Sequence, residues 1–279
     1  MEHGEILEFL PPSEEVCSVL VVEAVSLLAA LRQRLPQAAV TVLSREQGAL
    51  PAGVQWQHVD FRNMELSFPK ESFAYIIAPL VFDAVLEPER LGGKFWHWLR
   101  PDGHLLTGFA NIRHWQVLQE LMQGHFRYAE AGLSEQSGHF FALPEIVRFF
   151  ERLHYRELKF LPRLQPPSAE LHKRLRQAGF SDVQEDLSTK IWYVQAGAST
   201  AAAGALKRKF TPQLRRDMVY LLRRIENDIA PQENTRVLLR MCACYGVSME
   251  YLARLAENTM VRPKRVLQRI SSLLEAGRV

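Results

Sequence analysis

The sequence predicts an α/β fold: a Rossmann-like, seven-stranded sheet with helices on both faces, followed by a small all-α C-terminal module. Three observations lead to this prediction. Residues 16–35 join a run of branched apolar residues directly to a helical apolar pattern, β-rich runs then alternate with helical patterns, and charge is divided unevenly along the chain. Alternation at this spacing is typical of a parallel sheet covered on both faces.

The predicted strands are short apolar or alternating runs bounded by turn residues. In chain order they lie at residues 16–22, 39–43, 54–59, 73–78, 104–109, 155–161 and 190–195. Helical periodicity lies between them, at residues 27–35, 89–99, 111–123, 144–153 and 169–178.

Three local features join these elements. Residues 100–103 (RPDG) are typical of a proline-started turn before the fifth strand. Asn111 is placed to cap the helix after that strand. Residues 124–142 are irregular and rich in aromatic side chains, a pattern that predicts a lid rather than a core element.

Composition indicates a globular protein with a real core, since 47% of the 279 residues are hydrophobic. No apolar run approaches the roughly 18 residues that a membrane span needs. The acidic N-terminus lacks the layout of a signal peptide, so we expect a soluble, cytoplasmic protein. The three cysteines, Cys17, Cys242 and Cys244, form neither an even disulfide framework nor zinc-knuckle spacing, so we expect reduced thiols and no metal.

The net charge of +3 conceals two parts of opposite sign. Residues 206–279 hold 15 Lys/Arg against 7 Asp/Glu, or +8, which leaves −5 for residues 1–205. Small, uncharged residues lie near the junction, as linkers do. We therefore predict an α/β domain at 1–197, a linker at 198–210 and a basic helical bundle at 211–279. Helical patterns in the bundle begin at Pro212, Glu233, Met249 and Pro263.

Several ordered strings are similar to those of one protein family. They are residues 111–115 (NIRHW), 123–132 (QGHFRYAEAG) and 140–146 (FFALPEI), with shorter ones at 68–73 and 99–106. On these strings, residues 16–197 resemble class I S-adenosylmethionine-dependent methyltransferases, and more narrowly a bacterial subgroup associated with surface-polysaccharide synthesis. The resemblance implies the methyltransferase fold, S-adenosylmethionine as cofactor and a sugar or glycan intermediate as the molecule acted on.

The cofactor half of the chain departs from the family pattern. The family has a glycine-rich loop after the first strand, where this chain has Glu23, Val25 and Leu27. Side chains at these positions should block close approach of the backbone to a ligand, and a Glu23 carboxylate would lie near the cofactor's own carboxylate.

Of the other positions that bind the cofactor in the family, one matches the family pattern and the rest do not. The family's ribose-binding acid falls on Ser44, with Glu46 as the nearest acidic substitute, whereas Asp60 matches the acid expected after the third strand. The family also has a charged motif after the fourth strand, and here the segment that begins at Leu80 (LVFD) takes its place. The resemblance therefore directs any cofactor contacts to the following residues: Glu23, Ser26, Ser44, Glu46, Asp60 and Leu80.

Polar residues after the fifth strand are candidates for acceptor chemistry, because open α/β sheets bind ligands at this edge. Asn111 and Arg113 are candidate substrate-binding residues. His114 and His139 are candidate bases for removing a hydroxyl proton. The structural alternatives are a helix cap for Asn111, a surface charge for Arg113 and a packed ring for His114.

The sequence leaves three functions open. The first is a protein with a degenerate cofactor site and a binding or scaffold role in glycan synthesis, for which S-adenosylmethionine is not needed. The second is an active methyltransferase that binds its cofactor through Asp60, Glu46 and Ser26 and methylates a sugar or small-molecule hydroxyl.

The third function concerns the basic bundle. Residues 242–255 have a faint similarity to a helix-turn-helix, with Gly246 in the turn and Ser248 as a cap, which would serve nucleic-acid binding. A docking or homo-oligomerisation surface for an acidic protein partner is the favoured alternative.

Overall fold

The computed structural model describes residues 3–46, 50–60, 67–198, 212–245 and 247–275. Contacts divide the chain into two units, Met1–Arg156 with Leu161–Ser199 and Glu157–Phe160 with Thr200–Val279. The predicted linker lies almost wholly outside the described residues. Each unit is described by itself below.

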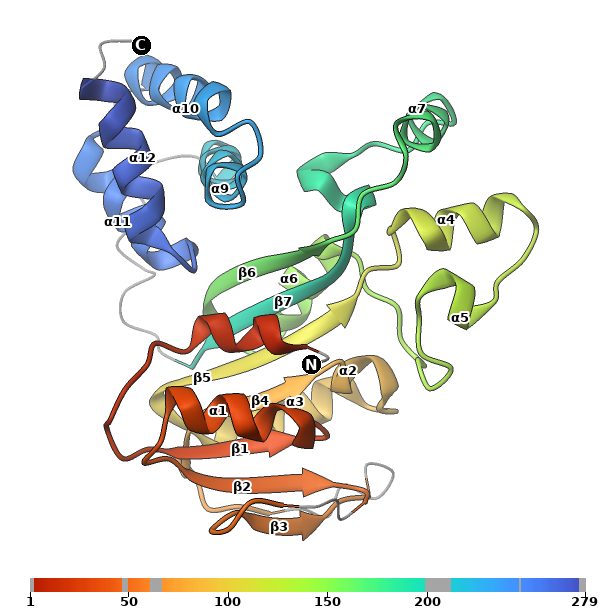
Figure 1. Ribbon diagram of the computed structural model, residues 1–279, viewed down its shortest axis with the longest axis vertical. Coiled ribbons are helices and arrows are strands. Elements are labelled where there is room, and N and C mark those ends of the chain that lie inside the picture. The colour runs from red at the N-terminus through yellow and green to blue at the C-terminus, as the bar shows by residue number, and fades with distance from the viewer. Residues whose placement is uncertain (1–2, 47–49, 61–66, 199–211, 246, 276–279) are drawn as a thin grey trace. The chain divides into compact units, whose positions relative to one another are not determined.

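Seven strands of the described chain form one sheet in the order β3-β2-β1-β4-β5-β7-β6 (Figure 1). The strands are β1 Ser18–Val22, β2 Ala39–Ser44, β3 Gln55–His58, β4 Phe73–Pro79, β5 Leu99–Ala110, β6 Arg156–Leu164 and β7 Thr189–Gly197. The predicted fold class is confirmed, with every predicted strand found in its place.

The sheet is mixed rather than parallel. β1 pairs in parallel with β2 and β4, β2 with β3, and β4 with β5, whereas β7 is antiparallel to β5. Because β1, β2, β4 and β5 run in the same direction, their carboxyl ends meet at one edge of the sheet. This edge is where open α/β sheets bind ligands.

Helices lie on both faces of the sheet, with α1 Leu28–Arg34 on one face and α3 Pro88–Trp98 and α6 Leu143–Arg152 on the other (Figure 1). The unit also contains α2 Val81–Ala84, α4 Trp115–Met122, α5 Tyr128–Ala131 and α7 Ala169–Gln177, with 3-10 turns η1 Gly4–Phe9, η2 Val25–Leu27 and η3 Val183–Ser188. The η1 turn was not predicted. It buries Ile6, Leu7 and Phe9 and contacts β5, β7 and α1.

The core of the first unit is apolar and aromatic. Val19, Leu20, Val21 and Val22 of β1 are fully buried. Beside the sheet, the ring of Phe82 packs against those of Phe95, Phe109 and Phe149 at centroid distances of 5.0–5.9 Å. This packing fixes the start of α2 against α3, α6 and β5, and so fixes the position at which β4 ends.

The predicted turn at residues 100–103 lies inside β5, and its placement before that strand is therefore corrected. Phe73 of β4 pairs with Leu99 and Tyr75 pairs with His104, so the intervening residues of β5 form a wide irregularity. Gly103 fits there because a Cβ at its position would lie 3.0 Å from Arg100 N, Arg100 O and Phe73 O.

The described part of the second unit consists of residues 157–160 of β6 and a set of helices. It contains α9 Pro212–Glu226, α10 Pro231–Tyr245, α11 Met249–Thr259 and α12 Pro263–Glu275. Ser248 caps α11 as predicted, since its Oγ accepts a hydrogen bond from Tyr251 N at 3.2 Å. Gly246 lies outside the described residues. Met218, Leu222 and Ile225 of α9 are fully buried in a core shared by all four helices.

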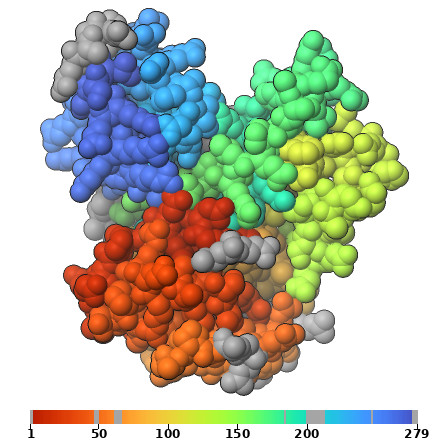
Figure 2. All heavy atoms as spheres, viewed as in Figure 1, coloured from red at the N-terminus to blue at the C-terminus, as the bar shows by residue number. Residues whose placement is uncertain are grey.

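Within the described ranges, no helix has the length and apolar character needed to cross a membrane. Over the same residues, no group of three or more His, Cys, Asp or Glu side chains is arranged to hold a metal ion. Figure 2 shows the segment after β5, coloured yellow to green, at the surface of the first unit.

Replacing Gly103 with Ala should lower the free energy of unfolding by about 2 kcal/mol, because the new Cβ would meet backbone atoms that cannot move independently. Gly93→Ala is the matched control, since a Cβ at that exposed position of α3 meets nothing within 4 Å. Urea unfolding of both variants measures the difference. Equal stability of the two variants would contradict the packing described for β5.

Candidate functional site

The first candidate region is the end of β1, where the backbone keeps a shape that glycine favours. Glu23 has a φ of 53°, in the left-handed region, and its N–H donates to Leu43 O at 2.8 Å. A residue with a Cβ pays roughly 1–2 kcal/mol in this conformation. The structure therefore combines a glycine-like backbone with a long acidic side chain.

The Glu23 side chain is directed to the end of β2. Its Oε1 accepts hydrogen bonds from Arg45 N at 2.8 Å and from Arg45 Nε at 3.3 Å. Arg45 Nη2 in turn donates to Gln136 Oε1 at 3.1 Å. We call these contacts the Glu23–Arg45–Gln136 bridge. It joins the carboxyl ends of β1 and β2 to the loop after α5.

The Ser44 hydroxyl is also engaged within the protein. Its Oγ donates to Glu46 O at 2.6 Å and accepts from Trp56 Nε1 at 2.9 Å, and Ser44 is buried. The side chains of Ser26 and Asp60, by contrast, are exposed. These polar groups therefore lie around the edge without forming one cluster of free ligand-binding atoms.

At the end of β4, Leu80 also has a left-handed backbone, with a φ of 53°. Three residues later, Asp83 is buried, and its Oδ2 accepts from Ala110 N at 2.9 Å. Its Oδ1 has no hydrogen-bond partner among the described residues. Burial raises the pKa of this carboxyl well above its usual range, against the opposing effect of the Ala110 bond.

Residues 134–141, which we call the covering segment, return to this edge. Gly138 N and His139 N donate to Asp83 O at 2.7 and 3.1 Å, and His139 Nε2 lies 3.2 Å from Leu86 O. At its end, Phe141 O accepts from Ile112 N at 3.0 Å. Together with the Glu23–Arg45–Gln136 bridge, these bonds hold the covering segment against the ends of β1, β2, β4 and β5.

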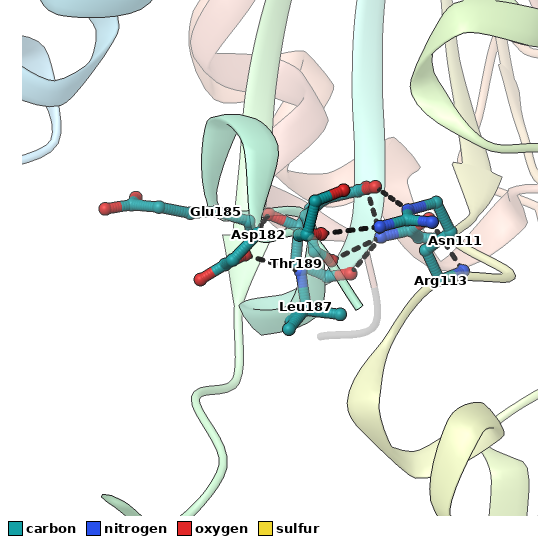
Figure 3. Close-up of polar contacts among 8 residues, drawn as sticks. Asn111, Arg113, Asp182, Glu185, Leu187 and Thr189 are labelled. Carbon is teal, nitrogen blue, oxygen red and sulfur yellow. Dashed lines mark hydrogen bonds and ion pairs between the residues drawn. The ribbon is translucent and has the colours of Figure 1, made fainter. Parts of the chain in front are cut away.

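The end of β5 is fixed by a second network, drawn in Figure 3. Asn111 is buried, and its Nδ2 donates to Asp186 O, Asp186 Oδ1 and Thr189 O at 2.7–3.0 Å. Arg113 forms an ion pair with Asp186 and donates to Ser181 O at 2.6 Å. Burial raises the pKa of the Asp186 carboxyl, while the bonds from Arg113 and Asn111 lower it.

The predicted role of Asn111 as a helix cap was wrong. Helix α4 begins at Trp115, with His114 at the cap position. The Asn111 side chain instead accepts from Arg113 N at 3.0 Å and reaches η3 and β7. The amide bonds to Asp186 and Thr189, which are distant in sequence, and does not cap α4. It does so because a buried amide needs partners for both of its N–H groups.

His114 is a buried ring rather than an exposed base. Its Nε2 lies 3.2 Å from Gln165 O, and its Nδ1 has no hydrogen-bond partner among the described residues. Burial is the main cause that lowers the pKa of His114 from 6.5 to about 4, and the charge of Lys190 acts in the same direction. The ring is therefore neutral at pH 7 and a weak base.

The structure thus brings Glu23 and His139 to one edge through the covering segment, and Asn111 and Arg113 into a separate network. Sequence reasoning missed Arg45, Gln136 and Asp186. Arg45 had a usable signal, because it directly follows β2 and carries the charge opposite to Glu23 at the end of the neighbouring strand.

No protein-family model matches the sequence, and no curated protein matches it either. Solved structures with a similar fold do exist. One is phosphoethanolamine N-methyltransferase 2 of Haemonchus contortus in complex with S-adenosylmethionine, at 13% identity and a TM-score of 0.49. The match covers 70% of this chain and 52% of that one, so it spans about half the length of that enzyme.

Two bacterial structures are matched over nearly their whole length. An S-adenosylmethionine-dependent methyltransferase of Mesorhizobium loti is 14% identical, with 69% of this chain and 95% of that chain covered and a TM-score of 0.47. A putative methyltransferase of Bacillus halodurans is 12% identical, with 71% and 99% covered and a TM-score of 0.47. At such identities the similarity concerns the fold alone, and the fold assignment rests on the strand order of this chain.

Acidification should destabilise the protein through His114. Because its folded-state pKa is about 4 against an ordinary 6.5, the unfolded chain takes up this proton first. The free energy of unfolding should therefore fall from pH 6.5 toward pH 4, by on the order of 3 kcal/mol for this group. Urea unfolding at several pH values measures the slope.

His114→Gln should remove this part of the pH dependence, whereas His139→Gln should keep it. An identical pH dependence in the wild type and in His114→Gln would show that the His114 ring does not titrate as described.

Proposed function

We propose that this chain is a methyltransferase-fold protein that does not use S-adenosylmethionine and instead binds a glycan intermediate of surface-polysaccharide synthesis, as a binding or scaffold component. The observation that carries the proposal is the Glu23–Arg45–Gln136 bridge across the ends of β1 and β2. The resemblance of residues 111–146 to the glycan-associated methyltransferases supports the choice of ligand.

The residues at this edge do not fit the cofactor. A glycine-rich loop lets the backbone approach a ligand and leaves its N–H groups free. Here Glu23 places a carboxylate between the ends of β1 and β2, and that carboxylate already accepts from the backbone of Arg45. The Ser44 hydroxyl, at the position of the ribose-binding acid, is used by Glu46 and Trp56.

The covering segment adds a second obstacle. Its contacts with Asp83 O and Arg45 hold it over the same edge, so a ligand the size of the cofactor would have to break several hydrogen bonds to enter. Each such bond contributes about 1 kcal/mol, and the loss would subtract directly from binding energy.

An exposed aromatic cluster that includes Phe140 of the covering segment is suited to a sugar. Phe126 and Phe140 are 38% and 39% exposed, although large apolar side chains are usually buried. The Phe126 ring lies 5.2 Å from that of Tyr128 and 5.7 Å from that of Phe140. A pyranose has an apolar C–H face, which packs well against exposed aromatic rings.

Isothermal titration calorimetry with millimolar S-adenosylmethionine tests the cofactor part of the proposal. We expect no measurable heat of binding to the purified full chain. Micromolar affinity would overturn the proposal and support the alternative of a working methyltransferase. In that case, a loss of affinity in Asp60→Ala would identify Asp60 as a cofactor contact.

An array of bacterial surface oligosaccharides tests the glycan part. Phe126→Ala and Phe140→Ala should each weaken binding of the captured glycan about tenfold, which corresponds to roughly 1.4 kcal/mol for one ring. Leu86→Ala is the control, because Leu86 is exposed and belongs to another loop. Absence of glycan binding, or equal affinity in all three variants, would contradict the aromatic site.

A further inference from the structure

An open hollow of about 410 Å³ lies in the second unit, between α10 and α12. Its size is within the range of small-molecule sites. Both of its charged lining residues are arginines, and they are joined by neutral polar side chains. The polar lining comprises Gln232, Thr235, Arg265, Gln268, Arg269 and Ser272.

The two arginines are held in place by one carboxylate. Asp228, in the turn between α9 and α10, forms ion pairs with Arg265 through Oδ2 and with Arg269 through Oδ1. Arg269 Nη1 also donates to Ile225 O at 2.6 Å. Two guanidinium groups against one carboxylate leave one positive charge uncompensated within this group.

This arrangement favours an anion with several oxygen atoms. An arginine has five N–H groups in a rigid plane, and the contacts with Asp228 and Ile225 use only some of them. Because the guanidinium groups are already ordered, a ligand need not immobilise them on binding. Pro231, where α10 begins, also lines the hollow, so the partial positive charge of the helix N-terminus adds to that of the arginines.

We propose that this hollow binds the phosphate group of a small molecule, with Arg265 and Arg269 as the recognising residues. Phosphate matches the planar N–H pairs of arginine and carries the charge that the site lacks. All the lining residues belong to the second unit, and none is used in the proposed glycan-binding role, so the two proposals can be tested independently.

Nucleic acid would be a different kind of ligand for this unit. The charged side chains on the exposed part of α11, the recognition helix of the predicted helix-turn-helix, are Glu250, Arg254 and Glu257. An acidic majority does not favour contact with a phosphate backbone. The nucleic-acid prediction itself stays untested.

Calorimetric titration of the full chain tests the proposal, with inorganic phosphate, glucose 1-phosphate and UDP as separate ligands at constant ionic strength. We expect at least one of them to bind. Arg265→Gln and Arg269→Gln should each weaken that binding at least tenfold, with circular dichroism confirming that the variants are folded. Arg254→Gln is the matched control, because Arg254 pairs with Glu250 on α11 outside the hollow, and it should bind as the wild type does.

Asp228→Asn supplies a test that a merely structural ion pair would not pass. Asn tolerates the left-handed backbone of this position, where φ is 62°. Removing the carboxylate takes away the negative charge that competes with phosphate for both arginines. This electrostatic gain should outweigh the lost ordering of the guanidinium groups, so phosphate affinity should rise several-fold. Unchanged or weaker affinity in Asp228→Asn would overturn the proposal. So would absence of binding by all three ligands.

Discussion

Hydrogen bonds between the carboxyl edge of the sheet and the covering segment are the interactions on which the proposed role depends. Glu23 occupies a left-handed backbone position at a cost of roughly 1–2 kcal/mol, and its carboxylate is then satisfied by Arg45 rather than by a ligand. Arg45 also donates to Gln136 of the covering segment, and Asp83 O accepts from two further N–H groups of that segment. A surface ion pair alone would contribute little. Here the backbone N–H groups of Arg45, Gly138 and His139 also donate, and these bonds fix the position of the segment against the sheet.

Most of the fold could be predicted because each strand is encoded locally. Val19 to Val22 form an unbroken buried run, and the predicted run at residues 39–43 lies within β2, which ends one residue later, at Ser44. What could not be predicted depends on contacts between distant residues. The antiparallel direction of β7 follows from its pairing with β5, and the early start of β5 from the pairing of Leu99 with Phe73. The η1 turn carries too short a pattern to be recognised without its neighbours.

The candidate site was predicted less completely, for the same reason. The sequence identified Glu23 as a departure from a glycine position, but its partner Gln136 lies 113 positions further along the chain. Asn111 looked like a cap because caps are local, whereas its buried amide is bonded to residues about 75 positions away. His114 was a candidate base by residue type, and only its burial, which lowers its pKa to about 4, shows how weak a base it is.

Hydrogen–deuterium exchange measures the closure of this edge most directly. The amides of Gly138 and His139, which donate to Asp83 O, and that of Arg45, which donates to Glu23, report on it residue by residue. If the covering segment is held as described, these amides should exchange about 100-fold more slowly than in an unfolded chain, with no change in millimolar S-adenosylmethionine. Exchange at the unfolded rate, or additional protection caused by the cofactor, would contradict a closed edge that excludes it.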